Sequence, residues 1–278
     1  MTPVPLREQV SLLLREVAGD VVMPRFRLLA PEEIDEKSPG EIVTIVDRES
    51  EARLADGLAA LGLGARIVGE EAAARDPGLL ADIGKGLVWL IDPLDGTANF
   101  AEGRAPFGMM VALVEDGEPL GAWIYDPLAG RLCHTERGKG ATCDGAPVRA
   151  RTASREPPRA ALGTHFMSAE RRARVHAAAG SLDVHPVPRC AAESYPRLVL
   201  GQDDIALFQR ILPWDHAAGA LFLTEAGGKA THWDGRPYRV GGSGQGMLAA
   251  ATPDLWQAAA DLLLGAEAGL AEMEILDR

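Results

Sequence analysis

The stretch at residues 89–100, WLIDPLDGTANF, joins a strongly apolar run to two aspartates. Residues 86–91 carry the short apolar pattern of a buried strand, which we expect to end at Asp92. Asp92 and Asp95 would then lie close together, where two like charges 4 Å apart repel by about 1 kcal/mol in water and about 4 kcal/mol near a protein surface. Such a cluster requires protons or cations. Oxygen ligands without His or Cys favour Mg²⁺ over zinc.

Gly96 and Thr97 directly follow these acids and supply a second kind of ligand group. A glycine lets the backbone approach a ligand closely, and the start of a helix presents free N–H groups to an anion. Acids, glycine and helix start together suit a phosphate held through a metal ion. Taken singly, the same residues also fit plainer roles, because Asp95-Gly96 is a common turn pair.

Upstream, other segments also deliver acids. IVTIV at residues 42–46 predicts a short buried strand, and helical spacing then predicts a helix that starts at Asp47, its expected N-cap, and runs to about residue 63. A strand over residues 65–68 precedes Glu70. Two strands, at residues 65–68 and 86–91, are therefore expected to end in carboxylates, although Asp47 alone would also suit a simple helix cap.

The remaining segments alternate between strand and helix patterns. The expected elements are a helix at residues 5–29, antiparallel hairpins at 107–135 continued at 137–150, a strand at 184–188, and helices from Ser168, Ala191, Asp215 and Thr252. Residues 151–160, rich in Arg and Pro, are the expected junction between an N-terminal half, 1–150, and a C-terminal half, 151–278. Without repeats or low-complexity tracts, the chain (1–278) is expected to form one mixed α/β unit.

Composition excludes several classes of protein. The chain has 278 residues, of which 47% are hydrophobic, enough for a large core. It shows neither a membrane-span pattern nor a secretory signal, so we expect a cytoplasmic protein without a membrane partner. The formal net charge is −12 and the Lys and Arg residues are scattered, which argues against nucleic acid as a partner. Three cysteines without a C-x-x-C pair are expected to be reduced thiols.

Two motifs carry a family resemblance. IDPLDGTANF resembles the D-P-[ILV]-D-G-T signature of the inositol monophosphatase family, and PWDHAAGALFLTEAGG, at residues 213–228, resembles its second signature, W-D-x-A-A-G. KSPGEIVTIVD (37–47), GEE (69–71) and ERGKGATCDG (136–145) extend the likeness over most of the chain. The resemblance implies a layered αβαβα sandwich of the inositol monophosphatase/fructose-1,6-bisphosphatase type, with the site between the two halves.

The resemblance also implies a reaction, the hydrolysis of a small phosphate ester by metal-activated water, and roles for individual residues. The implied ligands of two to three Mg²⁺ ions, with Mn²⁺ as an alternative, are Glu70, Asp92, the backbone carbonyl of Leu94, Asp95 and Asp215. Thr97, paired with Asp47, is implied to orient and deprotonate the attacking water, with Glu70 assisting. The N–H groups of Gly96 and Thr97 would bind the phosphate, and Lys37 would lie on a mobile loop near the metals.

The substrate side departs from the inositol-specific pattern. RCAA stands where the family has G-[ST]-A-A, so Arg189 and Cys190 replace a glycine and a hydroxyl residue. Phe208 stands where inositol-type enzymes place a glutamate, and Gln209 or Arg210 are candidate replacements. Losing a polar partner changes specificity strongly. Arg189 and Arg210 would suit a second anionic group, as in fructose 1,6-bisphosphate, and histidinol phosphate is another candidate substrate.

Some expectations rest on the resemblance alone or on weak signals. Homodimer formation and lithium sensitivity are implied by the family. A non-catalytic relative that binds metal or ligand is the competing hypothesis, which the presence of all the acidic ligands and of Thr97 disfavours. His216 is expected on a helix surface, and His165, like the four remaining histidines, lacks metal-ligand spacing and is given no role.

Overall fold

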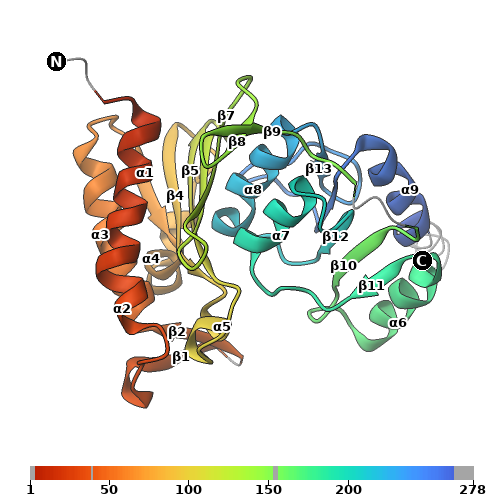
Figure 1. Cartoon of the computed structure of the whole chain (residues 1–278), viewed down its shortest axis with the longest axis horizontal. Coiled ribbons are helices and arrows are strands. Elements are labelled where there is room, and N and C mark those ends of the chain that lie inside the picture. The colour runs from red at the N-terminus through yellow and green to blue at the C-terminus, as the bar shows by residue number, and fades with distance from the viewer. Residues whose placement is uncertain (1–3, 39, 153–155, 266–278) are drawn as a thin grey trace.

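The computed structural model describes residues 4–38, 40–152 and 156–265, which form five packed layers (Figure 1). A helical layer, a seven-stranded sheet, a central pair of helices, a five-stranded sheet and an outer pair of helices follow one another. This order confirms the predicted αβαβα sandwich.

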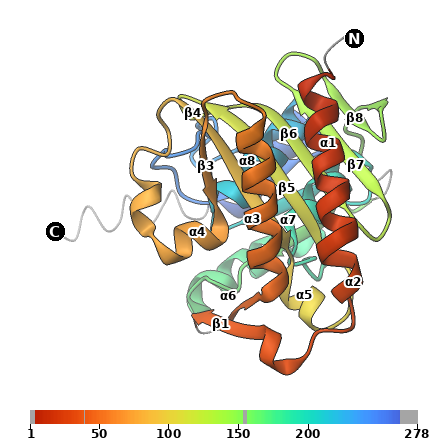
Figure 2. The same cartoon turned by 90° about the vertical axis from the view of Figure 1, so that its left-hand side faces the viewer.

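The first half of the chain builds the outer helical layer and the large sheet. The helices are α1 (Leu6–Val17), a π-helical turn (Ala18–Val22), α2 (Met23–Arg25), a 3₁₀ turn (Pro31–Glu33), α3 (Ile45–Ala60), α4 (Glu70–Arg75), a 3₁₀ turn (Pro77–Leu80) and α5 (Thr97–Ala101). The sheet runs in the order β3 (Arg66–Gly69), β4 (Leu87–Asp95), β5 (Gly108–Glu115), β6 (Glu118–Asp126), β7 (Arg131–Glu136), β8 (Ala141–Cys143) and β9 (Ala146–Val148). A separate antiparallel pair joins β1 (Ile34–Ser38) to β2 (Glu41–Thr44). Figure 2 shows α1 and α3 lying across one face of the large sheet.

The second half supplies the other three layers. The small sheet runs in the order β11 (Asp183–His185), β10 (Arg159–Gly163), β12 (Ile205–Phe208), β14 (Met247–Ala250) and β13 (Lys229–Thr231). The central helices are α7 (Ala191–Val199) and α8 (Pro213–Glu225), and the outer ones are α6 (Ala169–Ala178), followed by a 3₁₀ turn (Ala179–Ser181), and α9 (Pro253–Leu263).

The position of strand β4 in the fold explains why its sequence is apolar at successive residues rather than at every second one. Trp89 and Ile91 pack toward α1 and α3, whereas Val88 and Leu90 pack toward the central helices. Because both faces of the strand are covered, all positions from Val88 to Leu94 are buried. The apolar run therefore reflects a strand in the middle of the stack.

The register of β3 and β4 brings acids together. These two strands are parallel, and Gly69 lies opposite Ile91. Glu70 and Asp92 therefore follow at the same edge of the sheet, as the sequence predicts. The pairing of β4 with β5 shifts between Asp92 and Asp95, and this irregularity sets the two aspartates at different positions along the edge.

The start of α3 corrects one prediction. The helix begins at Ile45, and its N-cap is Thr44 rather than Asp47. The Thr44 hydroxyl accepts from the Val46 N–H at 3.1 Å, and Asp47 closes a capping box by accepting from the Thr44 N–H at 2.8 Å. Ile45 and Val46 are β-branched and look strand-like in sequence, but this cap places them in the first turn of the helix.

Other boundaries differ in smaller ways. The helix predicted over residues 5–29 is interrupted by the π-helical turn and ends at Arg25, and β4 continues past Asp92 to Asp95. Helix α8 starts at Pro213, before Asp215, because proline suits the first helical position. The predicted hairpins and the helix starting after Thr252 are confirmed.

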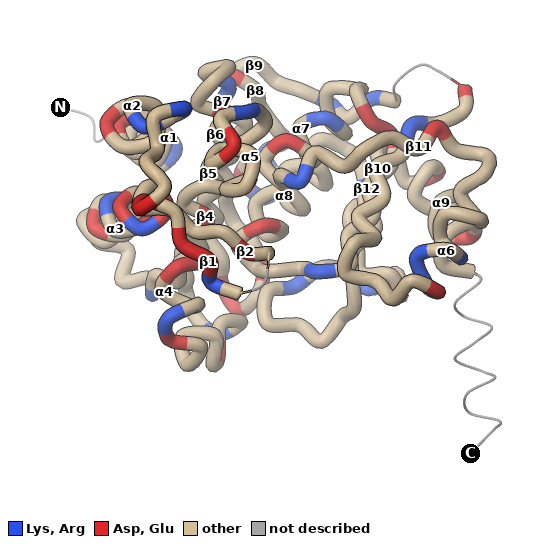
Figure 3. Tube along the Cα trace, turned by 90° about the horizontal axis from the view of Figure 1, so that it is seen from below, with Lys and Arg blue, Asp and Glu red and all other residues tan. Residues whose placement is uncertain are grey.

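Four further expectations concern the chain as a whole. Residues 153–155 of the predicted junction lie outside the described residues, and the division near residue 150 stays a prediction. The cysteines are free thiols, as predicted. Among the helices of the described segments, none combines the length and apolarity needed to cross a membrane. Figure 3 shows basic residues scattered over many elements, and the expected absence of a nucleic-acid partner stays a prediction.

Candidate active site

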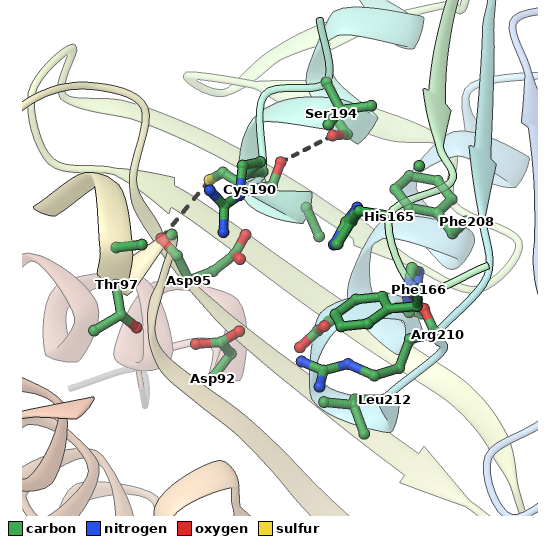
Figure 4. Close-up of a pocket in the computed structure, with 18 of the residues that line it drawn as sticks. Asp92, Asp95, Thr97, His165, Phe166, Cys190, Ser194, Phe208, Arg210 and Leu212 are labelled. Carbon is green, nitrogen blue, oxygen red and sulfur yellow. Dashed lines mark hydrogen bonds between the residues drawn. The ribbon is translucent and has the colours of Figure 1, made fainter. Parts of the chain in front are cut away.

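A cavity of about 430 Å³ lies between the two sheets, and residues of both halves line it (Figure 4). One side is formed by the end of β4 and the starts of α4, α5 and α8. The opposite side carries Phe166, Phe208 and Arg210, which come from the second half. A cavity of this size accommodates a small-molecule ligand.

Three carboxylates meet in this cavity. Oxygen atoms of Glu70, Asp92 and Asp215 lie within 4.8 Å of one another. Glu70 starts α4, Asp92 lies in β4 and Asp215 is in the first turn of α8, so three elements from both halves converge. The family resemblance implied that Asp215 joins the other two carboxylates, and the structure shows the three together.

The negative charges of these buried carboxylates repel one another and must be neutralised. Burial raises the pKa of Asp92 well above its ordinary value, and the neighbouring Glu70, Asp95 and Asp215 raise it further. Burial also raises the pKa of Glu70 to about 7, against the opposing charge of Lys37. Like charges in a low-dielectric site disfavour the ionised forms, which either protons or bound cations can relieve. An all-oxygen donor set of this kind fits Mg²⁺.

Asp95 lies beside the cluster but has an additional partner. Its Oδ2 accepts a hydrogen bond from the Ala192 N–H at 2.5 Å, at the start of α7. Burial raises the pKa of Asp95 to about 6, although this hydrogen bond opposes the shift. Asp95 therefore connects β4 to the central helices.

Thr97 and Asp47 are paired as the sequence predicts. The Thr97 hydroxyl lies 2.9 Å from Asp47 Oδ1 and 2.9 Å from the carbonyl of Leu94, so its single proton faces two acceptors. Asp47 Oδ2 accepts from the N–H and the hydroxyl of Thr44, at 2.8 and 2.6 Å. Burial raises the pKa of Asp47 to about 6 against these hydrogen bonds.

Gly96 turns the chain from β4 into α5. Its φ is 83°, a left-handed conformation that suits glycine. A Cβ at this position would lie 2.9 Å from the carbonyl oxygen of Pro106 and 3.3 Å from Cβ of Cys190. Both the backbone conformation and the lack of space therefore require glycine where the strand meets the helix.

Lys37 lies in β1 and reaches the acidic cluster from the β1–β2 pair. Its Nζ donates to Glu70 at 2.9 Å and also to Glu71. Burial lowers the pKa of Lys37, but the two glutamates outweigh burial and raise it above its ordinary value. The predicted proximity of Lys37 to the cluster is confirmed, whereas the predicted mobility of its loop stays a prediction.

Among the departures from the inositol pattern, Cys190 lies in the core and Phe208 packs against it, whereas Arg189 is exposed. Cys190 is buried, its thiol donates to the Asp95 carbonyl at 3.7 Å, and burial raises its pKa well above the ordinary value. Phe208 stacks on Tyr195, with ring centroids 5.6 Å apart. Cys190 is therefore a protonated, structural thiol, and Phe208 presents an aromatic ring to the cavity.

His216 corrects another prediction, because it is buried rather than on the helix surface. One ring nitrogen, Nε2, lies 3.1 Å from the Arg210 carbonyl, and Nδ1 lies 2.8 Å from the Tyr195 hydroxyl. A carbonyl can only accept, so Nε2 donates and Nδ1 accepts from the tyrosine. Burial lowers the pKa of His216 to about 4, which keeps it neutral. Its place directly after Asp215 was the only sequence signal.

Three other lining residues were missed or given no role by the sequence reasoning. Glu41 forms an ion pair with Arg210, and Phe166 lies under the same guanidinium, whose carbon is 4.6 Å from the ring centroid. His165 also lines the cavity. No local pattern marks these residues, because they come from β2 and from the segment after β10, which only the fold brings together.

Comparison with known proteins places these features in a family. Residues 6–266 match the model of the inositol monophosphatase family. An inositol-1-monophosphatase of Bacillus subtilis is 31% identical over 231 residues, covering 81% of this chain and 84% of that protein. A Thermotoga maritima protein named fructose-1,6-bisphosphatase/inositol-1-monophosphatase is 31% identical over 211 residues, covering 72% and 76%.

A solved structure agrees at the level of the fold. The crystal structure of inositol monophosphatase-II from Staphylococcus aureus matches with a TM-score of 0.79 at 23% identity, covering 96% of this chain and 97% of that one. The family match, the relatives and the convergence of the acidic residues point the same way. The chain belongs to the inositol monophosphatase family, a family of phosphoric monoester hydrolases.

Proposed function

We propose that the chain hydrolyses the phosphate ester of a small polyol or sugar in a Mg²⁺-dependent reaction. The observation that carries this proposal is the convergence of Glu70, Asp92 and Asp215, whose carboxylate oxygens lie within 4.8 Å of one another. Family membership supports the reaction class, and the intact set of acids disfavours the competing hypothesis of a non-catalytic relative.

The carboxylates are the proposed metal ligands. The full proposed set for two to three Mg²⁺ ions, with Mn²⁺ as an alternative, is Glu70, Asp92, the Leu94 carbonyl, Asp95 and Asp215. Bound divalent cations lower the pKa of coordinated water and stabilise charge on the phosphoryl oxygens. The protein's part is to hold these oxygens in place, which β4 and the first turns of α4 and α8 do.

Thr97 and Asp47 are the proposed proton acceptors. The Thr97 hydroxyl can take a proton from the attacking water while its own proton passes to Asp47 Oδ1, 2.9 Å away. Thr44 holds the other carboxylate oxygen and so fixes the orientation of Asp47. With a pKa raised to about 6 by burial, Asp47 is ionised at neutral pH and still basic enough to accept this proton.

Backbone N–H groups are proposed to hold the phosphate, and a lysine is proposed to stay beside the acidic cluster. The N–H groups of Gly96 and Thr97 start α5, where the first N–H groups of a helix lack partners within the helix. Phosphate oxygens can accept from such groups. Lys37, which already neutralises Glu70, is proposed to stay close to the metals through the β1–β2 pair.

The identity of the alcohol is a separate question. Phe208 cannot accept a hydrogen bond from a sugar hydroxyl, so inositol phosphate is one candidate beside fructose 1,6-bisphosphate and histidinol phosphate. The Thermotoga relative carries both of the first two activities in its name. A homodimer, a cytoplasmic location and lithium sensitivity are proposed on the family resemblance.

Asp95→Asn tests the metal assignment. The asparagine side-chain oxygen can still accept from Ala192 N–H, so the fold should be kept, while Mg²⁺-dependent phosphate release should fall by at least about 100-fold. Asp76→Asn changes an exposed aspartate outside the cavity and is the matched control. Unchanged activity of Asp95→Asn, with the control also unchanged, would refute the assignment.

A further inference from the structure

Two arginines line the cavity, and the structure distinguishes them sharply. Arg210 has its charge matched, because it forms an ion pair with Glu41, which also lines the cavity. Its guanidinium also lies over the ring of Phe166, with the carbon 4.6 Å from the ring centroid. An arginine held in this way would have to give up its partner before it could bind a substrate anion.

Arg189 has neither of these partners. Within the described part of the chain, its side chain makes no hydrogen bond or ion pair, and it is exposed while lining the cavity. The charged and titratable groups near it are Glu102, which is already paired with Arg104, and His165. Arg189 is therefore a cation available to a ligand.

The backbone of Arg189 has an unusual conformation. Its φ is 55°, a left-handed conformation that glycine adopts easily and arginine does not. Its neighbours are anchored, since Asn99 Nδ2 donates to the Pro188 carbonyl at 3.1 Å and the Cys190 thiol donates to the Asp95 carbonyl at 3.7 Å. Strained backbone conformations of this kind concentrate at functional sites.

The rest of the far wall combines aromatic and self-paired groups with Gln209, whose Oε1 is buried and has no hydrogen-bond partner among the described residues. Phe208 is stacked on Tyr195 and contributes an aromatic ring, while the Arg210–Glu41 pair satisfies its own charges. The cavity of about 430 Å³ is large enough for a sugar that carries more than one phosphate. A free guanidinium offers such a group a bidentate, charge-assisted contact.

We propose that Arg189 binds a second anionic group on the alcohol part of the substrate, and that the preferred substrates are therefore sugar bisphosphates rather than neutral polyol monophosphates. This inference rests on the proposed phosphatase function. Arg189 sets specificity and does not touch the phosphate that is cleaved. Arg210, in contrast, is held in the cavity wall by Glu41 and Phe166.

The experiment compares two sugars that share the same scissile phosphate, fructose 1,6-bisphosphate and fructose 1-phosphate. Wild-type protein should show a higher kcat/KM for the bisphosphate. Arg189→Gly, which also relieves the backbone, should lower kcat/KM for the bisphosphate by about 10- to 100-fold and leave the monophosphate within about twofold. Arg189→Lys should restore part of the loss, because it keeps the charge but not the bidentate geometry.

Arg27→Gly is the matched control. Arg27 is also a left-handed arginine, with φ 65°, but it donates to the Gly103 carbonyl and does not line the cavity. Its replacement should change the two rates equally or not at all. An equal fall of both rates in Arg189→Gly, or no preference of the wild type for the bisphosphate, would overturn the inference while leaving the phosphatase function intact.

If neither sugar is hydrolysed, a binding measurement separates the claim of hydrolysis from the claim that Arg189 binds a second anionic group. Calorimetry with Mg²⁺ then reports the affinities directly. Tighter binding of the bisphosphate that disappears in Arg189→Gly would support Arg189 as the binding group for the second anion, and would count against hydrolysis and therefore against the substrate preference. Equal binding of the two sugars, or equal binding by wild type and variant, would refute the inference as well.

Discussion

Mg²⁺ should stabilise this protein much more at pH 7.5 than at pH 5.5, because protons and metal ions compete for the same carboxylates. Burial raises the pKa of Glu70 to about 7 in the metal-free protein. At pH 5.5 the protonation of Glu70 alone weakens Mg²⁺ binding by about 30-fold, whereas at pH 7.5 it weakens binding hardly at all. The Mg²⁺ affinities at the two pH values therefore differ by about 25-fold. That ratio corresponds to about 1.9 kcal/mol.

Other titrating groups also change the stability of the protein with pH, so their contributions must be separated from that of Mg²⁺ binding. A carboxyl whose pKa is raised on folding binds more protons folded than unfolded, so its contribution to stability falls as pH rises from about 4 to about 7. His134 and His216, whose pKa values burial lowers to about 4, act in the opposite direction over about pH 4 to 6.5. Comparing melting temperatures with and without Mg²⁺ at one pH removes the histidine contributions, since both samples contain them.

The assay is thermal unfolding at the two pH values, with a fixed excess of Mg²⁺ or with chelator. About 1.9 kcal/mol corresponds to a difference of about 4–8 °C between the two metal-induced shifts for a chain of this size. Asp92→Asn removes one charge of the cluster while its amide oxygen can still accept from Leu94 N–H, and it should lose most of the Mg²⁺ response. An equal Mg²⁺ shift at both pH values, or a larger one at pH 5.5, would refute the reasoning.

Three other changes probe separate parts of the site. Thr97→Val should lower kcat by about 100-fold or more with little change in Mg²⁺ affinity, because it removes the hydroxyl that faces Asp47, whereas Thr97→Ser should keep most of the rate; equal rates for both variants would contradict the proton path. Gly96→Ala should cost about 1–3 kcal/mol in urea unfolding, since its φ is 83° and the new Cβ meets Pro106; an unchanged midpoint would count against this account. Phe208→Glu should raise the turnover of inositol 1-phosphate relative to other substrates but lower stability, because the stacking on Tyr195 is lost; an unchanged substrate ratio would place Phe208 outside the sugar pocket.

Much of the fold and of the acidic cluster could be predicted from local patterns. The apolar run before Asp92 predicts a central strand, and parallel pairing with β3 then places Glu70 beside it. The resemblance of the two motifs supplied the layer order and the inclusion of Asp215. These predictions succeeded because each depends on a short segment whose pattern or motif is strong.

The errors arose where two structures compete locally. Ile45 and Val46 favour a strand by their branching, but the hydroxyl of Thr44 caps a helix and recruits both residues into its first turn. His216 looked like a surface residue, yet the Tyr195 hydroxyl and the Arg210 carbonyl satisfy both ring nitrogens inside the protein. In both cases hydrogen-bond partners that the local pattern does not reveal decided the outcome.

The substrate side could not be predicted because its residues come from distant segments. Nothing near Arg210 in the sequence indicates that Glu41, 169 positions away, neutralises it. Nor does the sequence reveal that Arg189 has no hydrogen-bond or ion-pair partner among the residues that the structure describes. Such pairings depend on how the β1–β2 pair meets the small sheet, which is a property of the assembled layers.

The central claim, a metal-dependent phosphatase, is tested most directly by phosphate release. The panel contains inositol 1-phosphate, fructose 1,6-bisphosphate, histidinol phosphate and adenosine 3′,5′-bisphosphate, each assayed with Mg²⁺ and with chelator. Release of phosphate from at least one compound, lost on chelation and in Asp95→Asn, is the result that this account predicts. Release that survives chelation, or no release from any compound by folded protein that binds Mg²⁺, would contradict it.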